Sequence, residues 1–526
     1  MASGKIFFLL VIATLLALVG SWVVARSYRA SMKRLMQAPL ANAPATSTPS
    51  TAPEPPPPAG AAVFPKLDDN NATYRRLLLS FLALTLLIAL TRTLMTQIIA
   101  DGPITLKTVA ALGAAYAWPV LPVLAVIDRW SRPRFVGAML VWFVGAVLLL
   151  TWRTNENIVL AQVFQWMLFD TGLPLIVVTA LCLGGASRAV GPWLAPLFIV
   201  LCGSSQLGLD LLAALIEGQG PFINWLASRL GATPAFALFA LLPWLIAWWP
   251  ARALGRRLAR GYRERRISEL FYLFTAVWTI ALVGPALGAI HSLGWGAMVL
   301  FAPLLWIPLG ARLMQGRGAA TISGRPPTLL VLRVFQQDAN VQSIFDRVIE
   351  RWRLSGNTVL IAGTDLADRT IDADDIFTYL DGRLGERFID SAADLQARVQ
   401  QFEFHPDIEG RYRINECYCH DSTWQQALAR LVGISDVVLM DLRNFKARNA
   451  GCVHELGVLA SARDVTRVVI LSNRETDHAA AQAAAAGAPA GRFVWLDESD
   501  KASLRPLDIL ATLFPAAPVP SSGTAH

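Results

Sequence analysis

The sequence predicts a protein in two parts: a multi-span α-helical membrane block of about nine spans, and a cytoplasmic α/β domain with a doubly wound, largely parallel sheet. Hydrophobic residues make up 54% of the 526 residues and charged residues 16%, whereas ordinary globular chains are about 25% charged. From residue 77 to residue 313, apolar runs alternate with short arginine-bearing loops. From Pro326 onward, charges return and short apolar runs alternate with amphipathic segments. This pattern excludes a single soluble domain.

The first apolar run, residues 6–25, contains no charged residue and is long enough to cross about 30 Å of hydrocarbon. The basic residues Arg26, Arg29, Lys33 and Arg34 follow it directly, where a signal peptide would place a small-residue cleavage site. We therefore expect an uncleaved membrane anchor over residues 1–34. Residues 35–70 are rich in proline and alanine, and this composition predicts an extended linker without a core of its own.

The block from residue 71 to residue 316 divides into apolar runs of membrane-spanning length. These runs cover residues 77–98, 104–127, 135–152, 158–182, 193–216, 233–250, 270–290 and 293–311. Together with the N-terminal anchor they give the expected count of spans.

Arginines concentrate in alternate loops between these runs, at 26–76, 128–134, 183–192 and 251–269. Cytoplasmic loops carry the excess of Lys and Arg, so this distribution predicts an N-terminus outside and a C-terminal domain in the cytoplasm. We expect a multi-pass protein of the cell (inner) membrane, with the lipid bilayer as its partner. The same placement explains the net charge of +8, and no nucleic-acid partner is expected.

Two carboxylates, Asp170 and Asp210, fall within predicted spans. A carboxylate inside a membrane suggests an ion or substrate pathway, so a transporter with a regulatory cytoplasmic domain is one hypothesis. An interfacial or helix-capping role is the alternative. The block shows no repeated half, no row of charges and no filter-like motif.

Residues 325–516 are predicted to form the α/β domain, and 517–526 a disordered tail. Strands are expected at 328–335, 357–363, 411–419, 435–442, 466–472 and 492–497. Helices are expected at 340–356, 374–384, 391–402, 422–433, 448–462, 478–488 and 501–514. Alternating strands and helices indicate βαβ units, and ligands of such sheets bind beyond the carboxyl ends of the strands.

The helix expected at 448–462 carries a carboxylate, Glu455, among small and apolar residues. The preceding strand ends near Asp441, so the first turns of this helix should lie at the ligand edge of the sheet. Glu455 falls in the second turn, and helical side chains lean toward the N-terminus of their helix. Because the helix N-terminus favours negative charge, we expect an ionised carboxylate that faces this edge.

Residues 435–473, "SDVVLMDLRNFKARNAGCVHELGVLASARDVTRVVILSN", resemble the strand–loop–helix–strand segment of Toll/interleukin receptor (TIR) domains. Those domains have a small residue, a cysteine and a Glu-Leu pair in the helix, as at Cys452 and Glu455-Leu456. The same segment resembles nucleoside deoxyribosyltransferases, through Asp441, Asn449 and Glu455-Leu456-Gly457. His454 stands where the deoxyribosyltransferase pattern has an aromatic residue. The opening residues 332–365 are also similar to the start of a TIR domain.

The resemblance implies a Rossmann-like fold and two functions. Many TIR-like domains are signalling or assembly modules, and self-association through the domain would follow. The alternative is an N-glycosidase that acts on NAD or a nucleoside, with Glu455 as nucleophile or sugar-stabilising carboxylate and Asp441 as its partner. The remaining residues expected to bind substrate are Arg333, Asp338, Gly363, Thr364, Asp365 and Asn449. NAD would then be a substrate, and no cofactor is assigned.

Three cysteines and two histidines occur in "CYCH" (417–420) and "CVH" (452–454). Zinc binds such side chains, but neither segment has the Cys-x-x-Cys spacing of a zinc site. We expect small, buried, reduced cysteines and no metal centre.

Overall fold

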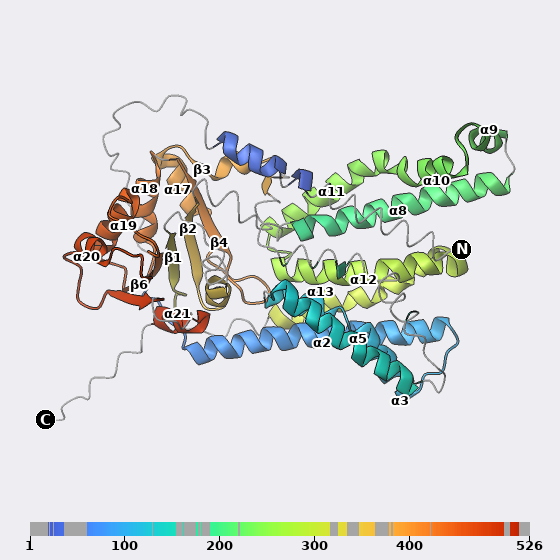
Figure 1. Ribbon diagram of the computed structural model, residues 1–526, viewed down its shortest axis with the longest axis horizontal. Coiled ribbons are helices and arrows are strands. Elements are labelled where there is room, and N and C mark those ends of the chain that lie inside the picture. The colour runs from blue at the N-terminus through green and yellow to red at the C-terminus, as the bar shows by residue number, and fades with distance from the viewer. Residues whose placement is uncertain are drawn as a thin grey trace. The chain divides into compact units, whose positions relative to one another are not determined.

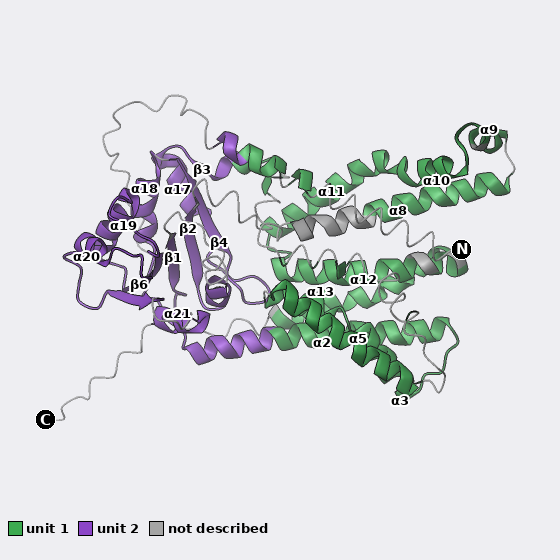
Figure 2. Ribbon diagram, in the orientation of Figure 1, with its two compact units in different colours: residues 1–31, 78–314, 368–384 green, residues 32–77, 315–367, 385–526 purple. Residues whose placement is uncertain are grey.

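The structure is a computed structural model, in which the chain folds into two compact units (Figure 2). Unit 1 comprises residues 1–31, 78–314 and 368–384, and unit 2 comprises residues 32–77, 315–367 and 385–526. The structure describes residues 19, 22–24, 26–35, 60–128, 130–153, 161, 175–176, 179, 183, 190–218, 221–315, 324–333, 347–362, 378–379, 382–420, 422–498 and 505–514.

Unit 1 is helical (Figure 1). Its elements are α2 (Leu67–Ile99, which begins in unit 2), α3 (Leu106–Tyr116), α4 (Val120–Ile127), α5 (Arg132–Arg153), α8 (Val190–Glu217), α9 (Pro221–Leu230), α10 (Ala232–Leu241), α11 (Pro243–Arg263), α12 (Glu269–Leu293), the 3-10 helix η3 (Gly294–Leu305) and α13 (Trp306–Gln315). Helix α8 packs against α10, α11 and α12, and α3 packs against α5.

Within the described ranges, six helical segments are long and apolar enough to cross a membrane. They are Leu67–Ile99, Arg132–Arg153, Val200–Glu217, Ala232–Arg263, Glu269–Ala286 and Gly294–Met314. The pair α3 and α4, bent by 41°, makes a seventh if it is one span. These segments overlap seven of the predicted apolar runs. The other two predicted runs, 6–25 and 158–182, lie almost wholly outside the described residues.

Unit 2 contains a seven-stranded sheet, and every strand pairing in it is parallel. The strands are β1 (Thr328–Arg333), β2 (Asn357–Ala362), β3 (Phe388–Ile389), β4 (Ile414–Cys419), β5 (Val437–Asp441), β6 (Arg467–Ser472) and β7 (Phe493–Asp497). Their order is β3-β4-β2-β1-β5-β6-β7. Strands β2, β4 and β3 lie on one side of β1, and β5, β6 and β7 follow on the other, which makes the β1–β5 boundary the topological switch point.

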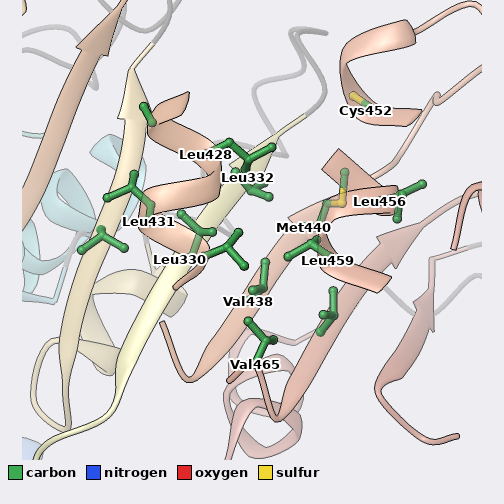
Figure 3. Packing of buried hydrophobic residues seen from close by; sticks show 14 of the residues in the cluster. Leu330, Leu332, Leu428, Leu431, Val438, Met440, Cys452, Leu456, Leu459 and Val465 are labelled. Carbon is green, nitrogen blue, oxygen red and sulfur yellow. The ribbon is translucent and has the colours of Figure 1, made fainter. Parts of the chain in front are cut away.

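Helices cover both faces of this sheet. On one face lie α17 (Ala392–Gln400), α18 (Trp424–Val432), α19 (Ala450–Ser461) and α20 (His478–Ala484). Figure 3 shows the centre of this layer, where leucines of α18 lie beside β1 and Leu456 and Leu459 of α19 lie beside β5. On the other face, α21 (Pro506–Leu513) packs on β5 and β6. Burial of these apolar faces is the main source of stability for such a layered fold.

The six predicted strands are confirmed, and β3 is the strand that the sequence did not reveal. It has two residues, which pair with Tyr418 and Cys419 of β4 at one edge of the sheet. Two residues are too few for strand periodicity to appear in a sequence. Helix α2 also begins at Leu67, three residues before the position at which the linker was expected to end.

Candidate functional site

The candidate site lies at the carboxyl end of β5, beside the switch point. Asp441 is the last residue of β5 and stands in register with Arg333, the last residue of β1. All five residues of β5 are buried, so the strand places Asp441 at the edge of the sheet with little freedom to move. A parallel sheet binds ligands at this edge, as the sequence predicts.

The loop from β5 to α19 is fixed by side-chain amides. Asn444 adopts a left-handed backbone conformation (φ 64°) and exchanges two hydrogen bonds with Asn473: its backbone N–H donates to Oδ1 at 3.0 Å, and its own Oδ1 accepts from Nδ2 at 2.9 Å. Asn449, which is expected to bind substrate, accepts a hydrogen bond on Oδ1 from the backbone N–H of Lys446 at 2.8 Å. Its side chain therefore shapes the loop that starts the helix.

Glu455 is buried on α19, with 8% of its surface exposed. Its side chain is hydrogen-bonded to the Cys452 thiol one turn earlier. Among the described residues its Oε2 atom has no hydrogen-bond partner. A buried, half-satisfied carboxyl group costs free energy, and such groups are found at functional sites more often than elsewhere.

The expectation of an ionised carboxylate at Glu455 is wrong for the protein at neutral pH. Burial raises the pKa of Glu455 to about 8, and the hydrogen bond from Cys452 lowers it only in part. Desolvation of the charged form therefore outweighs the favourable position near a helix N-terminus. The neutral acid can donate a proton or a hydrogen bond, and it becomes a nucleophile once it loses its proton.

Asp441 is paired with Arg443, a residue that the sequence did not single out. The guanidinium donates from Nε to Oδ1 at 2.9 Å and from Nη2 to Oδ2 at 2.8 Å, and the backbone N–H of Arg443 donates to Oδ1 at 3.0 Å. Arg443 also donates from Nη1 to Glu498 at 2.9 Å, just beyond β7. The sequence did carry one signal for this pair, because Arg443 follows Asp441, near the end of a predicted strand, by two positions.

The charge state of this pair is well defined. Burial works to lower the pKa of Arg443, but the hydrogen bonds and charges of Asp441 and Glu498 outweigh it and raise the pKa. The carboxylate of Asp441 is therefore committed to a cation, whereas Glu455 has none. No hydrogen bond joins the two carboxyl groups in the described structure, and the partnership of Asp441 with Glu455 stays a prediction.

Cys452, the hydrogen-bond partner of Glu455, is influenced by both carboxyl groups. Burial, the largest cause, together with the charges of Glu455 and Asp441 raises the pKa of its thiol to about 12. Both carboxyl groups are thus close enough to act on the sulfur. A thiol with this pKa stays protonated at neutral pH and is not a nucleophile.

His454, also on α19, is exposed. Its ring meets that of Trp424 on α18 edge to face, with 5.5 Å between centroids. The residue that departs from the deoxyribosyltransferase pattern therefore contacts a neighbouring helix at the surface of the unit.

Four of the residues expected to bind substrate lie outside the described residues: Asp338, Gly363, Thr364 and Asp365. For Arg333 the structure describes the backbone alone. In the part of the chain that the structure describes, no three His, Cys, Asp or Glu side chains are grouped to hold a metal ion. The cysteines of β4, Cys417 and Cys419, are buried.

Of the two carboxylates predicted within spans, Asp170 lies outside the described residues. Asp210 accepts a hydrogen bond from the side-chain amide of Gln206, one turn earlier in α8, at 2.8 Å. Transport remains a prediction.

Comparisons with protein-family models, with curated proteins and with solved structures found no match.

Proposed function

We propose that this chain is an integral membrane protein whose cytoplasmic α/β domain serves as a signalling or assembly module. The candidate spans support membrane insertion. With the apolar runs at 6–25 and 158–182 as further spans, the count would be about nine. The arginine-rich alternate loops support an N-terminus outside and the α/β domain in the cytoplasm.

The observation that carries this proposal is that one candidate span begins inside the α/β unit. Residues 67–77 of α2 belong to unit 2 and the rest of the helix to unit 1. The side-chain amide of Asn70 donates to Ser355 Oγ at 2.6 Å and to the carbonyl oxygen of Arg351 at 2.7 Å. The Arg351 guanidinium lies 3.9 Å from the centroid of the Tyr74 ring.

The segment before α2 is also bound to the sheet. The backbone N–H of Val63 donates to the carbonyl of Arg325 at 2.9 Å. The Arg325 guanidinium pairs with Asp436 through contacts of 2.5 and 3.0 Å, and Asp436 accepts from the backbone N–H of Thr328 at 2.8 Å. Residues 60–77 are thus joined to the starts of β1 and β5 and to the turn before β2.

A membrane helix held in this way gives a direct route from the bilayer to the α/β domain. A shift or tilt of α2 would move the side chains bonded to the residue 351–355 turn. Bilayer thickness changes the tilt of a membrane helix. Varying the thickness therefore tests this coupling without knowing what signal the protein receives.

The experiment places the full chain in nanodiscs of short-chain or long-chain phosphatidylcholine and measures hydrogen exchange in the α/β domain. We expect exchange of the 351–362 amides to differ between the two lipids in the wild type. The difference should disappear in Asn70→Ala/Tyr74→Ala and persist in Asp68→Ala/Arg76→Ala, which changes exposed side chains of the same helix. Equal behaviour of the two double variants, or no response in the wild type, would refute the coupling.

An N-glycosidase that acts on NAD or nucleosides is the second candidate, and Glu455 favours it. A buried carboxyl group with one unpartnered oxygen, at the switch point of a parallel sheet, suits the stabilisation or capture of an oxocarbenium-like sugar. Asp441 would act indirectly in this reaction, because Arg443 holds its carboxylate.

The test supplies NAD or nucleosides to the full chain, both dilute in detergent and concentrated on vesicles, and measures released base by chromatography. We expect Glu455→Gln to reduce the rate on the order of 10²-fold or more, while Glu475→Gln, an exposed control, leaves it unchanged. A nucleophilic Glu455 requires a rate that rises up to about pH 8, and a general acid requires one that falls above it. If wild type and Glu455→Gln release base equally, or neither does, the glycosidase hypothesis is lost.

A further inference from the structure

Helix α11 carries three exposed arginines on one face, Arg252, Arg256 and Arg260, here called the arginine stripe. Their spacing of four residues places them one above the other on the helix surface. In the described part of the chain none of the three forms an ion pair with a carboxylate, whereas Arg266, beyond the helix, pairs with Glu264. Three unpaired guanidinium groups on one face form a strong local positive charge.

The same face continues toward the N-terminus of α11 as an apolar surface. Leu245 and Trp249, at the positions that extend the stripe, are each 69% exposed. Both belong to the candidate span Ala232–Arg263. The order along this face is therefore aliphatic, then tryptophan, then arginine, which is the order of hydrocarbon, interface and headgroup in one half of a bilayer.

The side of α11 next to the stripe fixes it in place. Gly255, Ala259 and Tyr262 are buried on that side. The helix ends in a tight turn, in which the backbone N–H of Arg266 donates to the carbonyl of Gly261 at 2.9 Å. The sequence placed the end of this span near residue 250, but the helix continues to Arg263, and this extension arranges the arginines as a stripe.

We propose that the arginine stripe of α11 binds the phosphate groups of anionic phospholipids in the leaflet next to it. The inference rests on the membrane insertion proposed above. Guanidinium groups bind phosphate oxygens through paired hydrogen bonds, and the stripe is about 12 Å long, enough to engage more than one phosphate. A basic cluster directly after an apolar span is the arrangement expected for anionic-lipid binding.

The experiment uses the full chain in detergent micelles with phosphatidylglycerol that carries a fluorophore on its acyl chain, and follows binding by anisotropy. The test variant is Arg252→Gln/Arg256→Gln/Arg260→Gln. The matched control is Arg463→Gln/Arg474→Gln/Arg505→Gln, which removes the same charge from exposed positions of the α/β domain. Circular dichroism and size-exclusion chromatography establish that both variants are folded.

We expect the stripe variant to bind phosphatidylglycerol at least about tenfold more weakly than the control variant, and the corresponding Arg→Lys variant to retain most of the affinity. Unlabelled phosphatidylglycerol should displace the probe, and phosphatidylcholine should not. Equal affinity of the stripe and control variants would overturn the proposal. Displacement by phosphatidylcholine, inorganic phosphate or a short DNA duplex would also overturn it, because each indicates a different ligand.

Alkaline carbonate extraction of membranes separates this proposal from the one on which it rests. If the wild type leaves the membrane fraction, membrane insertion itself is refuted, and the stripe proposal with it. If the wild type stays in the membrane but shows no preference for phosphatidylglycerol, the lipid-binding role of the stripe alone is refuted.

Discussion

The carboxylate of Asp441 and the guanidinium of Arg443 form a buried ion pair with two parallel hydrogen bonds, of 2.9 and 2.8 Å, at the end of β5. Both side chains are at most 5% exposed. This pair separates the roles of the two carboxyl groups at the site. Asp441 is neutralised by a fixed cation, whereas Glu455 is neutralised by a proton.

The first prediction concerns this pair. Asp441→Asn leaves Arg443 with Glu498 as its remaining carboxylate, and we expect a loss of about 3 kcal/mol in the free energy of unfolding, since it breaks a buried pair. Hydrogen exchange of the β5 and β6 amides measures the loss. The control is Asp508→Asn, which removes an exposed ion pair to Arg505 and should cost less than about 1 kcal/mol. Equal effects would show that the Asp441 pair contributes no more than a surface contact.

The second prediction is a pH dependence set by Glu455. Its pKa is about 8 in the folded chain against an ordinary 4.5, so between these values the folded state holds a proton that the unfolded state has lost. Stability should therefore fall as pH rises from about 4.5 to 8, by on the order of 5 kcal/mol from this group, and it should be insensitive to this group above that range.

Unfolding of the full chain measured at several pH values gives this slope. Glu455→Gln should reduce the slope and be more stable than the wild type near pH 8, since a neutral amide replaces a buried charge. Glu475→Gln, at an exposed position, should leave the slope unchanged. An unaltered slope in Glu455→Gln would contradict the assignment.

The third prediction concerns the loop between β5 and α19. Asn444→Ala places a side chain with no polar atoms at a left-handed position and removes a hydrogen bond to Asn473, so we expect it to cost about 2 kcal/mol. Asn444→Gly relieves the backbone and should cost about 1 kcal/mol. Thermal unfolding of the two variants compares them. If the glycine variant is as unstable as the alanine variant, the backbone conformation is not what Asn444 provides.

The fourth prediction concerns Glu350, near the start of the sheet. Its carboxylate pairs with Arg353 at 3.0 Å and with Arg411 at 2.7 Å, and all three side chains are at most 11% exposed. Because Glu350→Gln leaves two buried cations without this charge, we expect a loss of about 3 kcal/mol, measured by hydrogen exchange in β2 and β4. Glu264→Gln, which breaks the exposed pair with Arg266, should change stability by less than about 1 kcal/mol.

The amino-acid sequence by itself determined the division into an apolar helical block and an α/β domain, together with six of the strands. Apolar runs of spanning length and short β-branched runs such as Val437–Asp441 are local patterns. A span in lipid or a strand buried in a sheet must be apolar, so the sequence itself shows these elements. The prediction that Glu455 lies near the ligand edge also rests on local order, because a helix that enters from a strand's carboxyl end starts at that edge.

The tertiary structure alone decided which groups act together. Arg443 bonds to Asp441 and also to Glu498, which lies 55 positions further along the chain. Asn70 bonds to Ser355, which lies 285 positions away. The proton on Glu455 likewise depends on burial by neighbouring elements, which no local pattern encodes. Pairing and desolvation are properties of packed elements in space, and for that physical reason the sequence could only propose a site, whereas the fold shows which of its charged groups are paired and which are buried.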